Sequence, residues 1–462
     1  MSVDRIPGSF RDPAGFVYRR DGRLLRQVNR SHAQVWDEVV ASGLFDALWD
    51  KGLLVRHEEV DLDLGDERAH VVIAPESITS LSQPHEWAPG QLRAAALTTL
   101  AVQKVALDHG MILRDASAHN IQFHMGRPVF IDTLSFAPIE PDAPWVAYGQ
   151  FCEHFLAPLA LQVLVDPRLR RLLVGRIDGV ELDLASEILP GRTKLRPGLA
   201  QHLHMHAKAQ GKAQGGAGGS SGASPRTAKF SHAALVGLAD SLRRTVEGLT
   251  FDPGPTVWGN YYAEIDHYDE SAMEAKVDIV TRQIAAVDPH VVWDLGANTG
   301  RFSRLAVAAG ASTVAWDIDV GAVEQAWQAV AGEDPQPLLP LVLDLGNPSP
   351  GLGWRHRERE SLTDRGPVDL AMALALVHHL AIGGNVPLPD VVDMLADVAD
   401  HVILEWVPKP DPKVQVLLST REDVFDDYTR EVLVAAIDRR FDTREVVPVP
   451  GTHRELFLLD RR

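Results

Sequence analysis

Residues Val291 to Gly300 read Val-Val-Trp-Asp-Leu-Gly-Ala-Asn-Thr-Gly, a short β-prone run that leads into an acid and a glycine-rich turn. The apolar residues from Arg301 to Ala309 have the spacing of a helix. A buried strand, a glycine turn and a helix form the opening unit of a doubly wound sheet, which binds ligands at the carboxyl ends of its strands. The stretch therefore predicts an α/β fold with a ligand site beside this turn.

Further strands and helices alternate along the chain on both sides of this unit. Apolar runs predict strands at 313–316, 339–343, 368–376 and 401–404, and a closing strand pair at 443–449 and 455–459. Together with the first strand they predict a doubly wound, mostly parallel, seven-stranded α/β sheet. Polar residues follow the strands that form its parallel part, at the edge where such sheets bind ligands.

The glycine turn differs from a dinucleotide-binding turn. The dinucleotide fingerprint G-x-G-x-x-G brings backbone close to a pyrophosphate, whereas this turn reads Asp-x-Gly-x-Asn-x-Gly from Asp294 to Gly300. An acid at this position opposes pyrophosphate and suits a ligand that carries an ammonium group and no phosphate. S-adenosylmethionine has these properties, and a carboxylate at the next strand end can accept hydrogen bonds from its ribose hydroxyls.

Three short motifs resemble motifs I, II and III of class I S-adenosylmethionine-dependent methyltransferases. They are Asp-Leu-Gly-Ala-Asn-Thr-Gly from Asp294, Trp-Asp-Ile-Asp from Trp316 and Leu-Asp-Leu from Leu343, and the resemblance extends over about 230 residues. Asn298 departs from the common pattern, which has a glycine there, but asparagine tolerates left-handed backbone angles better than most residues.

The resemblance implies a Rossmann-like domain with seven cofactor-binding residues: Asp294, Gly296, Asn298, Gly300, Asp317, Asp319 and Asp344. By this resemblance Asp294 helps to hold the amino group, Asp317 the ribose hydroxyls and Asp344 the adenine amine. The sequence leaves open that Asp317 or Asp319 only caps a helix. It also leaves open that Asp344 is a turn residue.

The fourth strand ends in His378-His379-Leu380, similar to many small-molecule methyltransferases and unlike the Asn/Asp-Pro-Pro-aromatic motif of nucleic-acid amino methyltransferases. A histidine here could remove a proton from a hydroxyl or amine during methyl transfer, and His379 is the first choice over His378. Glu405, at the end of the fifth strand, is a further candidate for base catalysis or acceptor binding. Packing against the adenine is the alternative role for a histidine.

Aromatic residues before the first strand of the methyltransferase-like region are candidates for a lid over the cofactor or for substrate contact. They are Tyr261, Tyr262 and Tyr268, and core packing is an equal alternative. Lys276 is a further candidate for the same lid. Histidines alternate at 202, 204 and 206 as they would on one face of a strand. No neighbouring cysteine or acid completes a site there, so no metal is expected.

The first half of the chain contains Asp115, Asn120 and Asp132 at a spacing that resembles the catalytic loop and metal-binding aspartate of protein-kinase-like folds. Residues 1–75 have no glycine-rich phosphate loop and no strand lysine of the kinase type, and Asp132 is followed by Thr133-Leu134 instead of Phe-Gly. The resemblance implies a degenerate α+β kinase-like module that scaffolds, presents substrate or pairs with another subunit. An active phosphotransferase and a chance resemblance stay open.

Composition and linkers divide the chain into a kinase-like module at 1–195, a flexible glycine-, serine- and alanine-rich linker at 196–229 and a methyltransferase domain at 230–462. The whole arrangement is similar to bacterial nodulation-protein-like methyltransferases, a label that does not define an acceptor. The predicted function is methyl transfer to a small molecule at oxygen or nitrogen. The alternatives are a protein or carrier-bound substrate docked by the first module, and a kinase-like regulator whose second domain senses S-adenosylmethionine.

Charge and composition narrow the partners and the compartment. The chain has 462 residues and a net charge of −18, and residues 230–462 carry 20 basic against 37 acidic residues. This part would repel a nucleic acid. A single cysteine, no signal-peptide core at the first residues and no apolar run of about 20 residues favour a cytoplasmic protein without a membrane anchor. The oligomeric state is not predicted.

Overall fold

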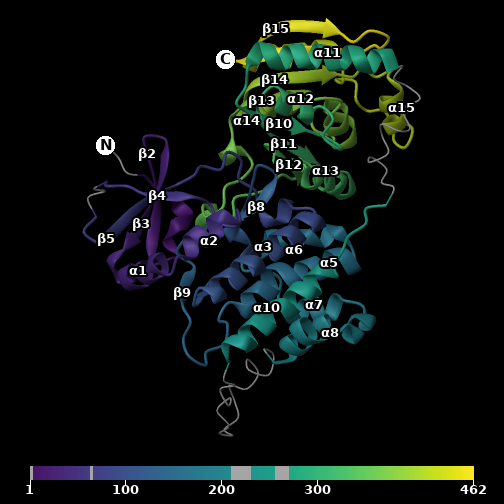
Figure 1. Cartoon of the computed structure of the whole chain (residues 1–462). Helices are drawn as coiled ribbons and strands as arrows, with labels where there is room; N and C mark the ends of the chain where they lie inside the picture. Colours follow the sequence, from purple (N-terminus) through teal and green to yellow (C-terminus); the bar gives the residue numbers. More distant parts are fainter. Residues whose placement is uncertain (1–3, 63–65, 210–229, 255–269) are drawn as a thin grey trace. The chain divides into compact units, whose positions relative to one another are not determined.

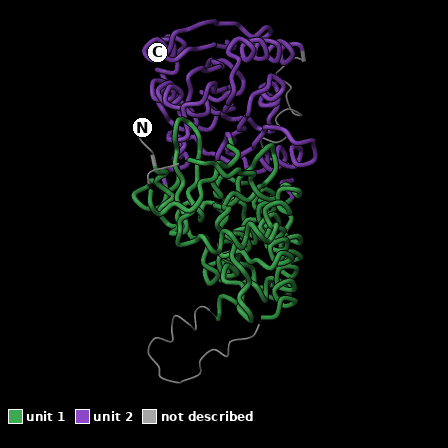
Figure 2. The backbone as a smooth tube through the Cα atoms, turned by 60° about the vertical axis from the view of Figure 1, so that its left-hand side comes forward, with its two compact units in different colours: residues 1–78, 82–251, 352–359 green, residues 79–81, 252–351, 360–462 purple. Residues whose placement is uncertain are grey.

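A computed structural model of the 462-residue chain describes residues 4–62, 66–209, 230–254 and 270–462. The chain forms two compact units, which Figure 2 distinguishes by colour. Unit 1 comprises residues 1–78, 82–251 and 352–359, and unit 2 comprises residues 79–81, 252–351 and 360–462. Within the described ranges, every helix is too short or too polar to cross a lipid bilayer.

Unit 2 is built on a seven-stranded sheet (Figure 1) with the strand order β12-β11-β10-β13-β14-β16-β15. The strands are β10 (Val291–Leu295), β11 (Ser312–Asp317), β12 (Leu338–Val342), β13 (Val368–Ala373), β14 (Ala399–Trp406), β15 (Phe441–Pro448) and β16 (Glu455–Arg461). The first five pair in parallel, whereas β16 runs antiparallel to both of its neighbours. The α/β class predicted from the sequence is confirmed.

Helices cover this sheet because its parallel strands are apolar on both faces. They are α11 (Glu270–Val287), α12 (Ser303–Ala308), α13 (Val320–Gly332), α14 (Leu388–Val398), α15 (Pro412–Leu418) and α16 (Arg430–Arg440). Val280 and Ile284 of α11 and Ala306 of α12 join Leu370 and Ile403 of the central strands in one buried cluster. This packing fixes the carboxyl ends of the strands, where the polar residues lie.

Unit 1 begins with an antiparallel sheet and continues as a mainly helical part. The sheet has the order β1-β2-β3-β5-β4, with β1 (Asp4–Arg5), β2 (Gly15–Arg20), β3 (Arg23–Asn29), β4 (His57–Glu59) and β5 (Ala69–Pro75). Two short antiparallel pairs follow: β6 (Met111–Leu113) with β9 (Phe136–Pro138), and β7 (Ile121–His124) with β8 (Arg127–Phe130). The helices of unit 1 are α1 (Ala33–Ala41), α2 (Leu44–Asp50), α3 (Pro89–Asp108), α4 (Tyr148–Phe151), α5 (Ala157–Leu164), α6 (Leu172–Gly175), α7 (Leu182–Ile188), α8 (Pro197–Leu199) and α10 (His232–Glu247).

The border between the units differs from the predicted division. Residues 197–209 are helical instead of forming part of a linker at 196–229. Helix α10 belongs to unit 1, where it packs on α3, although the sequence assigned residues 230–462 to the methyltransferase domain. Its apolar face, with Leu235 and Leu242 buried, explains the packing, because an amphipathic pattern predicts a buried face without saying what covers it. The glycine-rich stretch at 211–222 lies outside the described residues.

Two of the alternating histidines, His202 and His204, lie on a π-helix, Ala200–Met205, and His206 directly follows it, so none is on a strand. Each nitrogen of His202 meets a hydroxyl, from Tyr148 at 2.9 Å and Ser241 at 2.8 Å. His204 lies 2.9 Å from the hydroxyl of Thr193. In the described part of the chain no group of three or more His, Cys, Asp or Glu side chains is arranged to hold a metal ion. These histidines therefore stabilise the packing of helices in unit 1.

Candidate active site

The turn after β10 has the backbone geometry that its sequence predicts. Gly296 and Gly300 have φ angles of 80° and 83°, and Asn298 has a φ of 54°, in the left-handed region that favours glycine and asparagine. The backbone N–H groups of Gly296 and Ala297 each donate to the carbonyl oxygen of Trp316 at 2.8 Å. The turn is thus tied to β11, and its backbone faces the space beyond the strand ends.

Asp294, the last acid on β10, is almost completely buried with 2% of its surface exposed. Its carboxylate accepts a 2.6 Å hydrogen bond from the hydroxyl of Ser303 at the start of α12. Burial raises the pKa of Asp294 to about 6, and the hydrogen bond from Ser303 opposes this effect while the charge of Asp317 adds to it. The carboxylate is thus held rigidly and gains its charge near neutral pH.

Asp317 and Asp344 follow on the next two strands of the sheet. The Asp317 carboxylate accepts hydrogen bonds from the backbone N–H groups of Asn298 at 2.7 Å and Asp319 at 2.8 Å. Burial raises the pKa of Asp317, and these two donors oppose the shift. Asp344 accepts from the N–H of Gly346 at 3.0 Å. Asp317 is therefore oriented in part by the glycine turn, through the N–H of Asn298.

Asp319 has a different role from the one that the resemblance implied. Its carboxylate accepts from the N–H groups of Gly321 at 2.8 Å and Ala322 at 3.4 Å and caps the N-terminus of α13. This is the alternative that the sequence had left open for Asp319. The cavity described next is not lined by Asp319 in the described part of the chain.

A cavity of about 390 Å³ lies at the carboxyl ends of the strands in unit 2. Residues that the sequence singled out line it together: Asp294, Gly296, Asn298, Asp317, Asp344 and His379. Apolar side chains such as Leu343, Leu376 and Leu380 form much of the remaining wall. A volume of this size and an apolar wall with a few placed polar groups are typical of small-ligand sites. Gly300 is not part of the described lining.

The two histidines after β13 are not equivalent. His379 lines the cavity, whereas His378 is 1% exposed and its Nδ1 is buried without a hydrogen-bond partner. The rings are 4.2 Å apart between centroids. Burial, with the charges of Arg454 and Lys413, lowers the pKa of His379 to about 4. His379 is therefore a neutral imidazole at physiological pH and is able to accept a proton.

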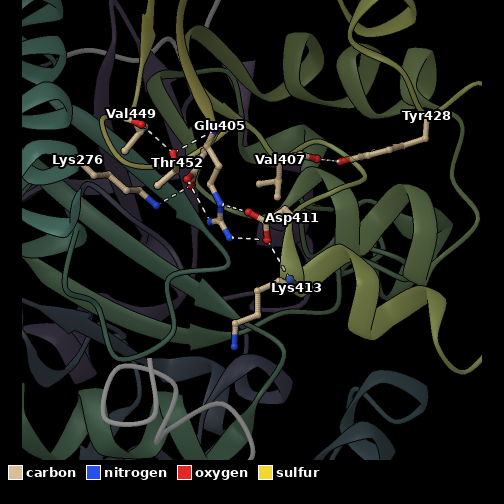
Figure 3. Close-up of polar contacts among 9 residues, drawn as sticks. Lys276, Glu405, Val407, Asp411, Lys413, Tyr428, Val449 and Thr452 are labelled. Carbon is tan, nitrogen blue, oxygen red and sulfur yellow. Dashed lines mark hydrogen bonds and ion pairs between the residues drawn. The ribbon is translucent and has the colours of Figure 1, made fainter. Parts of the chain in front are cut away.

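Glu405 does not reach the cavity in the described structure, and it is held as shown in Figure 3. Its two oxygens lie 2.6 Å from Nζ of Lys276 and 3.3 Å from Nη1 of Arg454, and its side chain is fully buried. Arg454 also forms a two-bond pair with Asp411, from Nε at 2.7 Å and Nη2 at 3.1 Å. A carboxylate between two cations is a poor base, so the catalytic role predicted for Glu405 is not supported by its surroundings.

Lys276 and Arg454 themselves line the cavity. Sequence reasoning placed Lys276 only in a lid and did not select Arg454. The reason is that their partners are remote in the sequence: Glu405 is 129 residues from Lys276, and Asp411 is 43 residues from Arg454. An isolated arginine before the closing strand carries no local signal of such a partner. The predicted lid and substrate residues Tyr261, Tyr262 and Tyr268 lie outside the described residues.

The kinase-like residues Asp115, Asn120 and Asp132 lie in unit 1, where Arg26 forms an ion pair with one of them. Asp132 lies 2.6 Å from Nη1 of Arg26, which is on β3. Burial tends to raise the pKa of Asp132, yet Arg26 and a hydrogen bond from Ser135 outweigh burial and lower it. Burial raises the pKa of Asp115, and the charge of Asp132 adds to that rise. Asn120 ends a short 3₁₀ helix, and its side chain lies close enough to Asp115 to oppose the rise in the pKa of that carboxyl.

Comparison with known proteins gives one relative over the whole length. The chain is 34% identical over 463 aligned positions to "Nodulation protein NoeA" of Rhizobium meliloti (strain 1021), and the match covers 99% of this chain and 96% of that protein. No protein-family model matches the sequence.

Solved structures give partial similarities. A crystal structure of WbdD has a TM-score of 0.30 and 18% identity over 40% of this chain and 39% of its own. The magnesium protoporphyrin IX methyltransferase ChlM from Synechocystis PCC 6803, solved with bound SAH, has a TM-score of 0.29 and 20% identity over 41% of this chain and 84% of its own. The N-methyltransferase NodS from Bradyrhizobium japonicum WM9 has a TM-score of 0.32 and 10% identity over 42% of this chain and 98% of its own.

Proposed function

Since this chain belongs to the family of the nodulation protein NoeA, we propose that it is a methyltransferase that uses S-adenosylmethionine to methylate a small molecule at oxygen or nitrogen. One observation carries the proposal. Acids at the ends of three adjacent parallel strands, Asp294, Asp317 and Asp344, line a single cavity with the glycine turn and His379. This arrangement supplies acceptors for a cationic, hydroxyl-rich ligand and a neutral base beside it.

The polar groups of the cavity match those of the cofactor. The ammonium group suits Asp294, which Ser303 orients. The ribose hydroxyls suit Asp317, because two backbone N–H groups fix its carboxylate. Asp344 takes the adenine amine. Lys276 suits the methionine carboxylate, since its ammonium lies 4.8 Å from the ring centre of Phe302 and is close enough to Asp294 for their charges to interact.

Methyl transfer requires little from the protein beyond the alignment of cofactor and acceptor and the removal of one proton. When bound, S-adenosylmethionine supplies an electrophilic methyl group on a sulfonium sulfur. An acceptor oxygen or nitrogen in the cavity beside His379 would receive that methyl group, and the cofactor's sulfur would keep the electron pair of the bond that breaks. His379 lines the cavity with a neutral ring and accepts the proton that the acceptor loses; its lowered pKa makes it a weak base.

Calorimetry with S-adenosylmethionine tests the cofactor site through Asp317→Asn. Removing the charge should weaken binding by about 1.5 to 3 kcal/mol, the range for hydrogen bonds to a charged group. Asp369→Asn is the matched control, because Asp369 also accepts two backbone N–H groups, from His290 at 2.8 Å and Val291 at 2.9 Å, but outside the cavity. Equal affinities of wild type and Asp317→Asn would refute the ribose-binding role.

For unit 1 we propose a kinase-like module that does not transfer phosphate. Its antiparallel sheet, its mainly helical second part and the loop with Asp115 and Asp132 support the kinase-like assignment. The guanidinium of Arg26 supports the loss of activity, because it neutralises the carboxylate that would bind Mg²⁺. The role of unit 1 is then to present or dock a substrate for unit 2.

A further inference from the structure

The buried ions beside the cavity form a chain of four charges with alternating sign. In the order Lys276, Glu405, Arg454, Asp411 each side chain contacts the next, and none is more than 8% exposed. Figure 3 labels Lys276, Glu405 and Asp411. Burying four charges is costly, and a buried ion pair adds little to stability compared with apolar packing. Such a network is therefore better explained by a ligand that needs one of its members held in place.

The signs of the charges divide the cavity. Asp344, Asp317 and Asp294 follow or end β12, β11 and β10, on one side of the sheet order, whereas Arg454 precedes β16 on the other side of β13. In the described part of the chain, Lys276 and Arg454 line the cavity while Glu405 and Asp411 are buried outside it. Asp344, Asp317 and Asp294 thus form an acidic wall, Arg454 stands apart from it on the other side of β13, and Lys276 interacts with both Glu405 and Asp294.

Arg454 lines the same cavity as His379, the residue to which the proposed function gives the acceptor's proton. Its positive charge contributes to the lowered pKa of both His378 and His379, after burial as the main cause. Lys413 also contributes at His379. Asp411 and Glu405 engage three nitrogens of the guanidinium and fix its plane.

From this geometry we propose that Arg454 binds a carboxylate on the methyl acceptor and thereby selects acidic acceptors. The inference rests on the proposed function, which assigns the acidic wall to S-adenosylmethionine and His379 to the acceptor. A planar guanidinium held by two acids is already ordered, so little side-chain entropy is lost when the carboxylate binds. Leu376 and Leu380 give an apolar surface for the body of the acceptor. Glu405 and Asp411 are positioning residues that act through Arg454.

The test uses benzoate and benzamide, which have the same shape and differ in charge. Each is titrated calorimetrically into the full-length protein saturated with S-adenosylhomocysteine. Benzoate is expected to bind at least about tenfold more tightly than benzamide. Equal affinities, or no binding of either compound, would overturn the proposal. If S-adenosylhomocysteine itself does not bind, the proposed function fails first and is recognised separately.

Arg454→Lys keeps the positive charge but loses the planar fork, and it should abolish most of the preference for benzoate while leaving the affinity for S-adenosylhomocysteine unchanged. Arg440→Lys is the matched control, because Arg440 also pairs with two acids, Asp393 at 2.9 Å and Asp397 at 3.0 Å, away from the cavity. A preference that survives in Arg454→Lys contradicts the assignment. If Arg454→Lys instead lowers the affinity for S-adenosylhomocysteine, Arg454 binds the methionine carboxylate of the cofactor and the proposal is wrong. If Arg454→Lys does not fold, the comparison of benzoate with benzamide in the wild type decides.

Discussion

At the scale of single residues, a buried acid of the cavity makes the free energy of unfolding depend on pH. Burial raises the pKa of Asp294 to about 6, above its usual value near 4. The folded state therefore binds this proton more tightly than the unfolded state does. The resulting stabilisation is present below about pH 4 and is lost as the pH rises through about 6.

Asp294→Asn should remove this dependence, because an amide has no proton to lose and still accepts a hydrogen bond from Ser303. Between pH 4 and pH 7 the wild type should lose about 2 to 3 kcal/mol of unfolding free energy relative to the variant, from a shift of about two pKa units. Urea unfolding of both proteins across this range measures the difference. If that difference stays constant with pH, the raised pKa is wrong.

At the scale of elements, the glycine turn after β10 joins backbone conformation to ligand access. Gly296 has a φ of 80°, and a Cβ there would lie 3.3 Å from Cδ1 of Leu376 on the cavity wall. Gly310 also has a positive φ, 98°, but a Cβ there would meet nothing within 4 Å. The two positions share the backbone strain and differ only in what surrounds them.

Gly296→Ala and Gly310→Ala should each destabilise the protein by about 1 to 2 kcal/mol, the cost of a left-handed conformation for an L-residue. Only Gly296→Ala should also weaken the binding of S-adenosylmethionine, because its methyl group adds bulk at the cavity wall. Thermal unfolding gives the first quantity and calorimetry the second. Cofactor affinity lost equally in both variants would show that strain alone, and not the cavity, is responsible.

Much of unit 2 could be predicted from the sequence because its signals are local. The parallel strands are mainly apolar runs, and Asp294, Asp317 and Asp344 lie at or just after the carboxyl ends of three of them. The position of α10 could not be predicted, because its apolar face fits either unit. The ion pairs that hold Glu405 could not be predicted either, because its partners Lys276 and Arg454 come from distant parts of the chain. Contacts between remote residues leave no periodic pattern in the sequence.

At the scale of the whole molecule, the two units share chain segments. Residues 352–359 lie between β12 and β13 in the sequence but belong to unit 1, where Glu358 pairs with Arg11 through two bonds of 2.6 and 2.9 Å. Residues 79–81 are counted with unit 2. The chain therefore passes between the units several times, and removal of either unit would break the other's sequence.

Mg-ATP should leave the melting temperature of the full-length protein unchanged, because Arg26 already pairs with Asp132 in unit 1. S-adenosylmethionine should raise it, since a ligand that binds only the folded state stabilises that state. Thermal unfolding with each ligand at the same concentration checks both statements. A rise with Mg-ATP would indicate a working nucleotide site and would favour the kinase-like regulator.

The most direct measurement of the central claim is transfer of an isotopically labelled methyl group. Full-length protein is incubated with labelled S-adenosylmethionine and a metabolite extract, and mass spectrometry follows labelled products and S-adenosylhomocysteine. We predict that both form together, and that His379→Ala lowers their rate by about 10²- to 10⁴-fold, the usual range for a lost general base, while cofactor affinity is kept. Binding of S-adenosylmethionine without any labelled product or S-adenosylhomocysteine would contradict the claim that this protein is a methyltransferase.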